Sequence, residues 1–382
     1  MRLQALTAGV ETPAECFSGV VHSVFRHACN VSHERGALLT LVSWDKGNLP
    51  QGFRLNTPSG FSFLNLARVG QPVFCRGGIL RIHGSDLSVD LRTASRWHVD
   101  LKDLRLDLHS PDRTRAWSVA WRELVTHGDE RGVSSSFMAT YPAGPTSHHR
   151  WCEKGLYERA TPLVSALVRA TSRLDLEDAV AATHSMIGLG SGLTPSGDDF
   201  LVGYLAGLWS TTGDHPARRH FMAGLGAGLF RAGGNTNVIS RTYLNFAIQG
   251  YTSEPITMLA QQLKLAGDDA TIQRATRVAL QVGHTSGADG VFGLLLGCLA
   301  WTASPLLALI GAHMPHVPQC GFRERRNDAA RTLFLTWYTI LCSSCRPGNW
   351  RAVPLAHSCR DLRGGWVGVR RSTLLQDLLF AD

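Results

Sequence analysis

Short β-rich hydrophobic runs, separated by glycine turns, dominate the first hundred residues of the chain. The runs span residues 19–25, 37–42, 72–75, 79–83 and 87–91. Turn residues such as Gly77-Gly78 and Gly84-Ser85-Asp86 stand between them, as expected for strands joined by tight connections. This part of the chain is therefore predicted to form a small antiparallel β-domain, either a barrel or a sandwich.

The hydrophobic period changes from Asp112 onward. Apolar residues recur there at helical spacing up to Val125, and a connection rich in Gly, Ser and Pro follows. Beyond it the pattern predicts eight helices, at 153–173, 176–187, 198–209, 217–231, 237–249, 254–266, 269–282 and 289–301. The predicted fold class is α+β. The predicted domains are a β-rich region ending in a helix (1–127), a linker (128–150), an all-α domain (151–301) and an atypical C-terminal extension (302–382).

Two of the predicted helices begin with the same phrase. Residues 196–207 (SGDDFLVGYLAG) and 286–297 (SGADGVFGLLLG) both read S-G-x-D-x-x-x-G-x-x-x-G. The G-x-x-x-G spacing places two glycines on one helix face, where another backbone can approach closely. We expect these two helices to be buried and packed against each other. Parallel packing would bring their N-termini together and antiparallel packing would separate them; the sequence leaves both arrangements open.

Polar, glycine-rich segments precede three of the predicted helices and supply the candidate binding residues. A helix N-terminus presents unpaired backbone N–H groups and partial positive charge, so several starts brought together would hold a small anion. The candidate substrate-binding residues are Gly192, Thr194, Ser196, Gly197 and Asp198 in the first segment, Thr236, Asn237 and Ser240 in the second, and Thr285, Ser286 and Gly287 in the third. The candidate catalytic residues are Asp199, Asp289 and His284, the last as a proton carrier. The same residues could instead serve only as helix caps.

Other kinds of site receive less support from the sequence. The first segment lacks the lysine of a nucleotide-binding Walker loop and the glycine spacing of a dinucleotide fingerprint. No metal site is assigned, although Mg²⁺ coordination by Asp198, Asp199 and Asp289 is an alternative. The nine Cys residues have no framework spacing, and unpaired thiols are a simpler interpretation than a zinc site at Cys342, Cys345, His357 and Cys359.

The charge distribution argues against a nucleic-acid partner. The net charge is +8, but residues 302–382 supply +5 of it, so the rest of the chain is nearly neutral and lacks a basic stripe. The N-terminus has no apolar signal region. Residues 290–312 carry no charge, but Pro305 would interrupt a membrane span, and a buried helix ending near Trp301 is the better interpretation. We expect a cytoplasmic protein.

The three segments together resemble the AllH family. The resemblance rests on residues 188–203, on 283–293, and on Thr236, Ile239, Ser240, Tyr243 and Gly250 in the second segment, and it extends over about residues 20–301. It implies a subunit of a bacterial oxamate carbamoyltransferase in allantoin breakdown. That enzyme would work with an FdrA-like subunit and another partner to convert oxalurate and phosphate into oxamate and carbamoyl phosphate.

These ligands are small oxyanions, which suits the site predicted from the residues themselves. Two functions remain open at this point. In the first, the chain is a transferase subunit in which Ser196, Gly197, Ser286 and Gly287 bind the oxyanion. In the second, it is a non-catalytic scaffold that supports FdrA-like catalytic partners.

Overall fold

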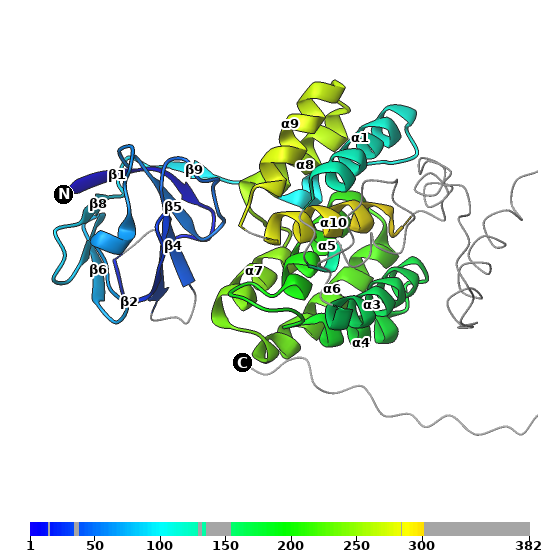
Figure 1. The fold of residues 1–382 in the computed structure, drawn as a ribbon, viewed down its shortest axis with the longest axis horizontal. Coiled ribbons are helices and arrows are strands. Elements are labelled where there is room, and N and C mark those ends of the chain that lie inside the picture. Colours follow the sequence, from blue (N-terminus) through cyan, green and yellow to red (C-terminus); the bar gives the residue numbers. More distant parts are fainter. Residues whose placement is uncertain (14–15, 34–37, 129–131, 135–153, 284, 302–382) are drawn as a thin grey trace, which may run out of the picture. The chain divides into compact units, whose positions relative to one another are not determined.

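The structure is a computed structural model that describes residues 1–301 apart from 14–15, 34–37, 129–131, 135–153 and 284. A strand-rich part is followed by helices (Figure 1), so the predicted α+β class is confirmed. The predicted extension at 302–382, the candidate zinc ligands within it and most of the predicted linker lie outside the described residues.

The strand-rich part is a closed barrel. Its strands are β1 (Arg2–Gly9), β2 (Phe17–Val24), β3 (Ala28–His33), β4 (Leu38–Val42), β5 (Gly52–Leu55), β6 (Pro72–Arg76), β7 (Ile79–Ile82), β8 (Ser88–Asp90) and β9 (Ser95–Trp97). They are hydrogen-bonded in the order β5-β4-β3-β2-β6-β7-β8-β1-β9, and β1 also pairs with β5. This last pairing closes eight strands into a ring, in which β9 follows β8 along the same edge of β1.

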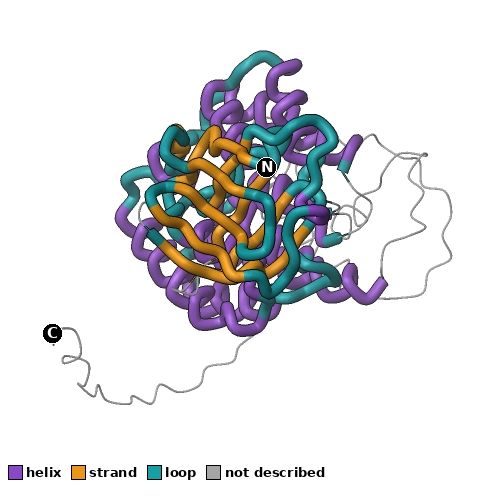
Figure 2. Tube along the Cα trace, turned by 90° about the vertical axis from the view of Figure 1, so that its left-hand side faces the viewer, coloured by secondary structure: helices purple, strands orange, loops and turns teal. Residues whose placement is uncertain are grey.

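Alternation of side chains fills the barrel. The strands lie side by side in a curved sheet (Figure 2). In β6 and β7 every second residue is buried, so Val73, Cys75, Leu80 and Ile82 belong to the core while their neighbours are more exposed. The sheet is mixed rather than antiparallel as the sequence predicted, because β1 runs parallel to β8 and β9, and β4 runs parallel to β5.

The helical part contains all eight predicted helices and the earlier one near Asp112. They are α1 (Pro111–His127), α3 (Lys154–Ser172), α4 (Leu176–Met186), α5 (Ser196–Thr212), α6 (Pro216–Ala232), α7 (Val238–Ile248), α8 (Glu254–Leu265), α9 (Asp269–Leu280) and α10 (Ser286–Leu299). Three short 3₁₀ segments are η1 (Phe63–Asn65), η2 (Leu101–Asp103) and η3 (Gly233–Asn235).

Helix α1 belongs to the helical core, although the sequence-based division grouped it with the β-rich region. Trp117 and Trp121 are buried in that core, and the indole of Trp117 donates a hydrogen bond to the Leu295 carbonyl at 3.0 Å. The barrel has its own core, to which Ala94 still contributes, and Leu101 is already in the helical one. The chain therefore passes from the barrel to the helical part between these two residues.

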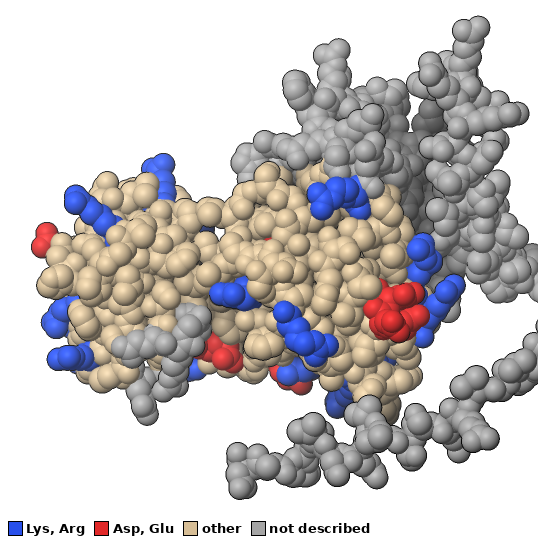
Figure 3. Space-filling model, turned by 90° about the horizontal axis from the view of Figure 1, so that it is seen from below, with Lys and Arg blue, Asp and Glu red and all other residues tan. Residues whose placement is uncertain are grey.

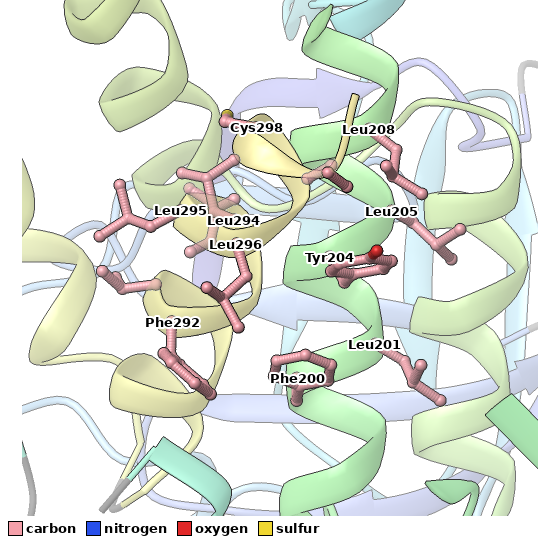
Figure 4. Close-up of a cluster of buried hydrophobic side chains, with 14 of the residues drawn as sticks. Phe200, Leu201, Tyr204, Leu205, Leu208, Phe292, Leu294, Leu295, Leu296 and Cys298 are labelled. Atoms are coloured by element: carbon pink, nitrogen blue, oxygen red, sulfur yellow. The ribbon is translucent and has the colours of Figure 1, made fainter. Parts of the chain in front are cut away.

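The two repeat helices, α5 and α10, are packed against each other at the centre of the helical part. Every residue of α10 from Gly287 to Leu299 is buried. Figure 4 shows the helices side by side and running in the same direction, with Phe200 and Phe292 near one end and Leu208 and Cys298 near the other. The packing is therefore parallel, the arrangement that brings the two N-termini together.

Glycines make this close packing feasible. A Cβ atom on Gly203 would overlap the carbonyl oxygen of Gly290, and one on Gly293 would overlap that of Phe200. The two contacts are equivalent, because corresponding positions of the two repeat helices are ninety residues apart: Gly203 corresponds to Gly293, and Phe200 to Gly290. The contacts of Gly207 with Leu294 and of Gly297 with Tyr204 form a second equivalent pair. The two helices are thus related by a local pseudo-two-fold axis.

Two further expectations concern the surface. Among the helices that the structure describes, none combines the length and apolarity that crossing a bilayer requires, and α10 ends at Leu299, close to the predicted end. On the face drawn in Figure 3, Lys and Arg side chains are scattered and do not form a stripe.

Candidate functional site

Both repeat helices begin at their serine, which changes the role expected for that residue. Helix α5 starts at Ser196 and α10 at Ser286, and neither helix has a side-chain cap. The sequence had suggested Thr194, Ser196 and Ser286 as caps. Because these hydroxyls do not cap the helices, they are available for other contacts.

The hydroxyls and carboxyls of the two helix starts meet each other. The hydroxyls of Thr194 and Ser286 are 2.8 Å apart. The Ser286 hydroxyl lies close enough to the Asp199 carboxyl to lower its pKa, and the Ser196 hydroxyl acts in the same way on Asp289. Each serine therefore serves the aspartate of the other helix, which is the reciprocity that a pseudo-two-fold axis produces. We refer to Thr194, Ser196, Asp199, Ser286 and Asp289 as the paired-start cluster.

Burial makes the two aspartates weak acids. Desolvation raises the pKa of Asp199 to about 8, against hydrogen bonding by Ser286, and the nearby Asp289 raises it further. Desolvation likewise raises the pKa of Asp289 to about 7, opposed by hydrogen bonds from Ser134 and Ser196. At neutral pH both carboxyls therefore hold a proton for much of the time. Oδ2 of each is buried and has no hydrogen-bond partner among the described residues.

Asp198 has a different role from its neighbour. Its carboxyl accepts from the backbone N–H of Gly188 at 2.8 Å and from the Thr236 hydroxyl at 2.5 Å, and it is 1% exposed. Burial raises the pKa of this carboxyl, and the contacts with Thr236 and Gly188, together with the nearby buried Ser240, oppose the rise. Asp198 thus ties the segment before α5 to the segment before α7, and its carboxyl faces the protein interior.

Asn237 caps one of the helices. Its side-chain oxygen accepts from the backbone N–H groups of Ile239 and Ser240, so it caps α7. Its amide nitrogen donates to the carbonyl of Leu193 at 2.8 Å. The second and first segments are therefore joined at this point as well.

The glycines of the two serine-glycine steps lie in close packing contacts. The N–H of Gly197 donates to the Leu189 carbonyl, and the N–H of Gly287 donates to the Val282 carbonyl, both at 2.8 Å. A Cβ atom on Gly197 would overlap the Met186 carbonyl oxygen, whereas Gly287 lies against the carbonyls ending α9. Both N–H groups are thus engaged with carbonyl groups of the protein. Gly192, by contrast, has a φ of +102° and no atom near its missing Cβ.

The cluster is layered from solvent to interior. Thr194, Asp199, Thr285 and Ser286 are half-buried, whereas Asp289 is 0% exposed. A small molecule arriving from solvent would meet the half-buried layer first. His284, the predicted proton carrier, lies outside the described residues.

Two contributors to the cluster were missed by sequence reasoning. Tyr243 of α7 is half-buried; burial and the charge of Asp199 together raise the pKa of its phenol to about 12. The position of Tyr243 in the second segment was the sequence feature that could have identified it. Ser134 donates its backbone N–H to Asp289 Oδ1 at 2.8 Å across 155 positions of chain, and no local pattern could have indicated this contact.

The described part of the chain contains no set of ligands for the Mg²⁺ alternative. There, no three Asp, Glu, His or Cys side chains are placed to share one ion. Asp198 also points toward Gly188 and Thr236 rather than toward the other two aspartates.

The raised pKa values predict that the wild-type protein loses stability as pH rises. The folded protein keeps protons on Asp199 and Asp289 that the unfolded chain releases near the ordinary value of 3.8. The stabilisation is fully present below that value and is lost as pH rises through about 7 and 8, at up to about 1.4 kcal/mol per pH unit for each proton.

Asp289→Asn, which cannot ionise, should flatten this dependence. Urea unfolding of both proteins between about pH 5 and pH 8 measures it. Parallel profiles for wild type and variant would show that Asp289 titrates normally.

Comparison with known proteins gives two family matches. Residues 186–298, which include all three segments, match the family described as oxamate carbamoyltransferase subunit AllH. Residues 4–96, which form most of the barrel, match the AllH family N-terminal domain. Together the matches span more than half of the chain. No solved structure matches it.

Proposed function

Because the chain belongs to the AllH family, we propose that it is a subunit of a cytoplasmic oxamate carbamoyltransferase and that the paired-start cluster binds the substrates. The reaction would convert oxalurate and phosphate into oxamate and carbamoyl phosphate, with FdrA-like and other subunits completing the enzyme. The observation that carries the proposal is the parallel packing of α5 and α10, which brings two polar helix starts to one place.

The physical chemistry of the cluster supports an anionic ligand. Each helix N-terminus carries about half a positive charge, and two that lie together reinforce one another. The hydroxyls of Thr194 and Ser286 can turn from each other to donate to an oxyanion. A carboxylate would normally repel such a ligand. Asp199, with its pKa raised to about 8, is largely protonated at neutral pH and can donate as well.

The same protonated carboxyl suits the bond rearrangement. A phosphate oxygen attacks the terminal carbamoyl carbon of oxalurate, the bond from that carbon to the oxamate nitrogen breaks, and this nitrogen takes up one proton. Asp199 gives that proton and recovers one from the attacking phosphate, so the protons balance. His284, directly before Thr285, is a second candidate for this transfer.

A variant that lacks the Asp199 carboxyl distinguishes the transferase-subunit function from the scaffold function. The tagged chain is purified with its partners, and carbamoyl phosphate formed from oxalurate and phosphate is measured. We expect Asp199→Ala to assemble normally and to lower the rate at least about tenfold, since proton transfer typically contributes about a hundredfold or more. Ser185→Ala, an exposed hydroxyl on α4, is the control.

Full activity in an assembled Asp199→Ala complex would favour the scaffold function. In that case the three segments would serve only to cap and join helices, and the catalytic groups would belong to the FdrA-like partners.

A further inference from the structure

A short segment distant in sequence covers the innermost carboxyl of the cluster. Gly132, Val133 and Ser134 are all buried, with Val133 0% and Ser134 2% exposed. The backbone N–H of Ser134 donates to Asp289 Oδ1 at 2.8 Å, and the backbone of Val133 also hydrogen-bonds this carboxyl. Buried backbone N–H groups nearly always have hydrogen-bond partners, and here the partner is a single carboxyl group.

The residue at position 132 must be glycine for the segment to lie there. Its φ is +106°, a conformation that side chains oppose. A Cβ atom would stand 2.5 Å from Asp289 Oδ2 and 2.8 Å from Oδ1, closer than real Cβ atoms approach an oxygen. Gly132 and the Asp289 carboxyl are therefore in van der Waals contact, with no room between them for water.

We propose that Gly132–Ser134 forms a wall of the site, in addition to the three segments that precede the helices. This wall positions the Asp289 carboxyl opposite Asp199 and shields the Asp289 carboxyl from water. Neither family match covers these residues, which fall between 96 and 186. The contact geometry carries the inference: two backbone donors, a glycine without space for a methyl group, and a fully buried carboxyl whose Oδ2 has no hydrogen-bond partner among the described residues. Its consequence for catalysis rests on the proposed function; the shielding does not.

The wall acts on Asp199 through Asp289. Desolvation is the largest cause that keeps Asp289 protonated, and the charge that Asp289 acquires on ionising makes Asp199 harder to ionise. Within the described part of the chain, Asp198 and Tyr243 also interact electrostatically with Asp199. Opening the wall would hydrate Asp289 and let it ionise at lower pH. Ser134 and Val133 are thus positioning residues, since they reach the ligand only through the aspartates.

A titration of the ligand-free, full-length protein tests the wall. The ¹³C carboxyl signals of Asp199 and Asp289, assigned with Asp→Asn variants, are followed against pH in wild type, Gly132→Ala and Gly70→Ala. Gly70 is the matched control, since it has a φ of +88° and nothing within 4 Å of its missing Cβ. We expect Gly132→Ala to lower the midpoint of Asp289 by about one pH unit or more, and Gly70→Ala to leave it unchanged.

An Asp289 midpoint equal in all three proteins would overturn the inference. If Gly132→Ala does not fold, Val133→Ala replaces it, because a smaller buried side chain admits water without backbone strain, and the same comparison decides. Carbamoyl phosphate binding is then measured against pH with the same proteins. Absence of binding in wild type would refute the proposed function and leave the titration result standing.

Discussion

Gly203→Ala and Gly293→Ala should each destabilise the protein by about 3 kcal/mol or more, because each added methyl group would overlap a backbone carbonyl of the partner helix. A flexible side chain could move aside, but the backbone of a buried helix can yield only if the whole helix shifts. Such a shift would also separate the starts of α5 and α10. Urea unfolding followed by circular dichroism measures the loss of stability.

Gly290→Ala, which lies on α10 like Gly293→Ala, is the matched control. Its Cβ atom would meet the end of the Ile256 side chain at 3.4 Å and the Asp199 carbonyl oxygen at 3.9 Å, both ordinary contacts. Since alanine favours the helix over glycine, this variant should be neutral or more stable by up to about 1 kcal/mol. Equal stability of Gly203→Ala, Gly293→Ala and Gly290→Ala would contradict the close parallel packing.

The helices and their glycine-lined contact could be predicted from the sequence because their causes are local. Helical spacing and Gly250, which has a φ of +89° just after α7, mark the helices and one of their ends. The direction of packing could not be predicted, because G-x-x-x-G permits both parallel and antiparallel approach. The direction is a property of the tertiary packing, and the meeting of the two helix starts depends on it.

Some strands of the barrel were not predicted, for a different reason. β3 carries polar residues along its length, β5 has only four residues, and β1 pairs with strands more than forty positions away. Long-range partners, rather than local propensity, stabilise such strands. For the same reason, the parallel pairings within the barrel could not be predicted from the sequence.

For the site, sequence reasoning identified the residues better than their roles. Asp199, Asp289 and Ser286 do come together with Thr194. Asp198 and Asn237 join the segments, and Gly197 and Gly287 allow close packing, because burial and hydrogen-bond partners depend on the fold. The contact of Ser134 with Asp289 depends on a distant segment and had no signal in the sequence.

Removing both hydroxyls at the outer layer of the cluster should abolish most of the affinity for a small anion. In the double variant Thr194→Val with Ser286→Ala, the shape of the site is nearly kept and two donors are lost. A hydrogen bond to a charged group contributes about 1.5 to 3 kcal/mol, so the loss should be about a hundredfold or more. Exposed Ser185→Ala on α4 should bind as wild type does.

Calorimetric titration of the purified chain with carbamoyl phosphate, and separately with oxamate, tests most directly whether the two parallel helix starts form one anion site. We expect the wild type and Ser185→Ala to bind and the double variant to release no measurable heat at the same concentrations. Equal binding by the double variant, or no binding of either ligand by the wild type, would contradict the account.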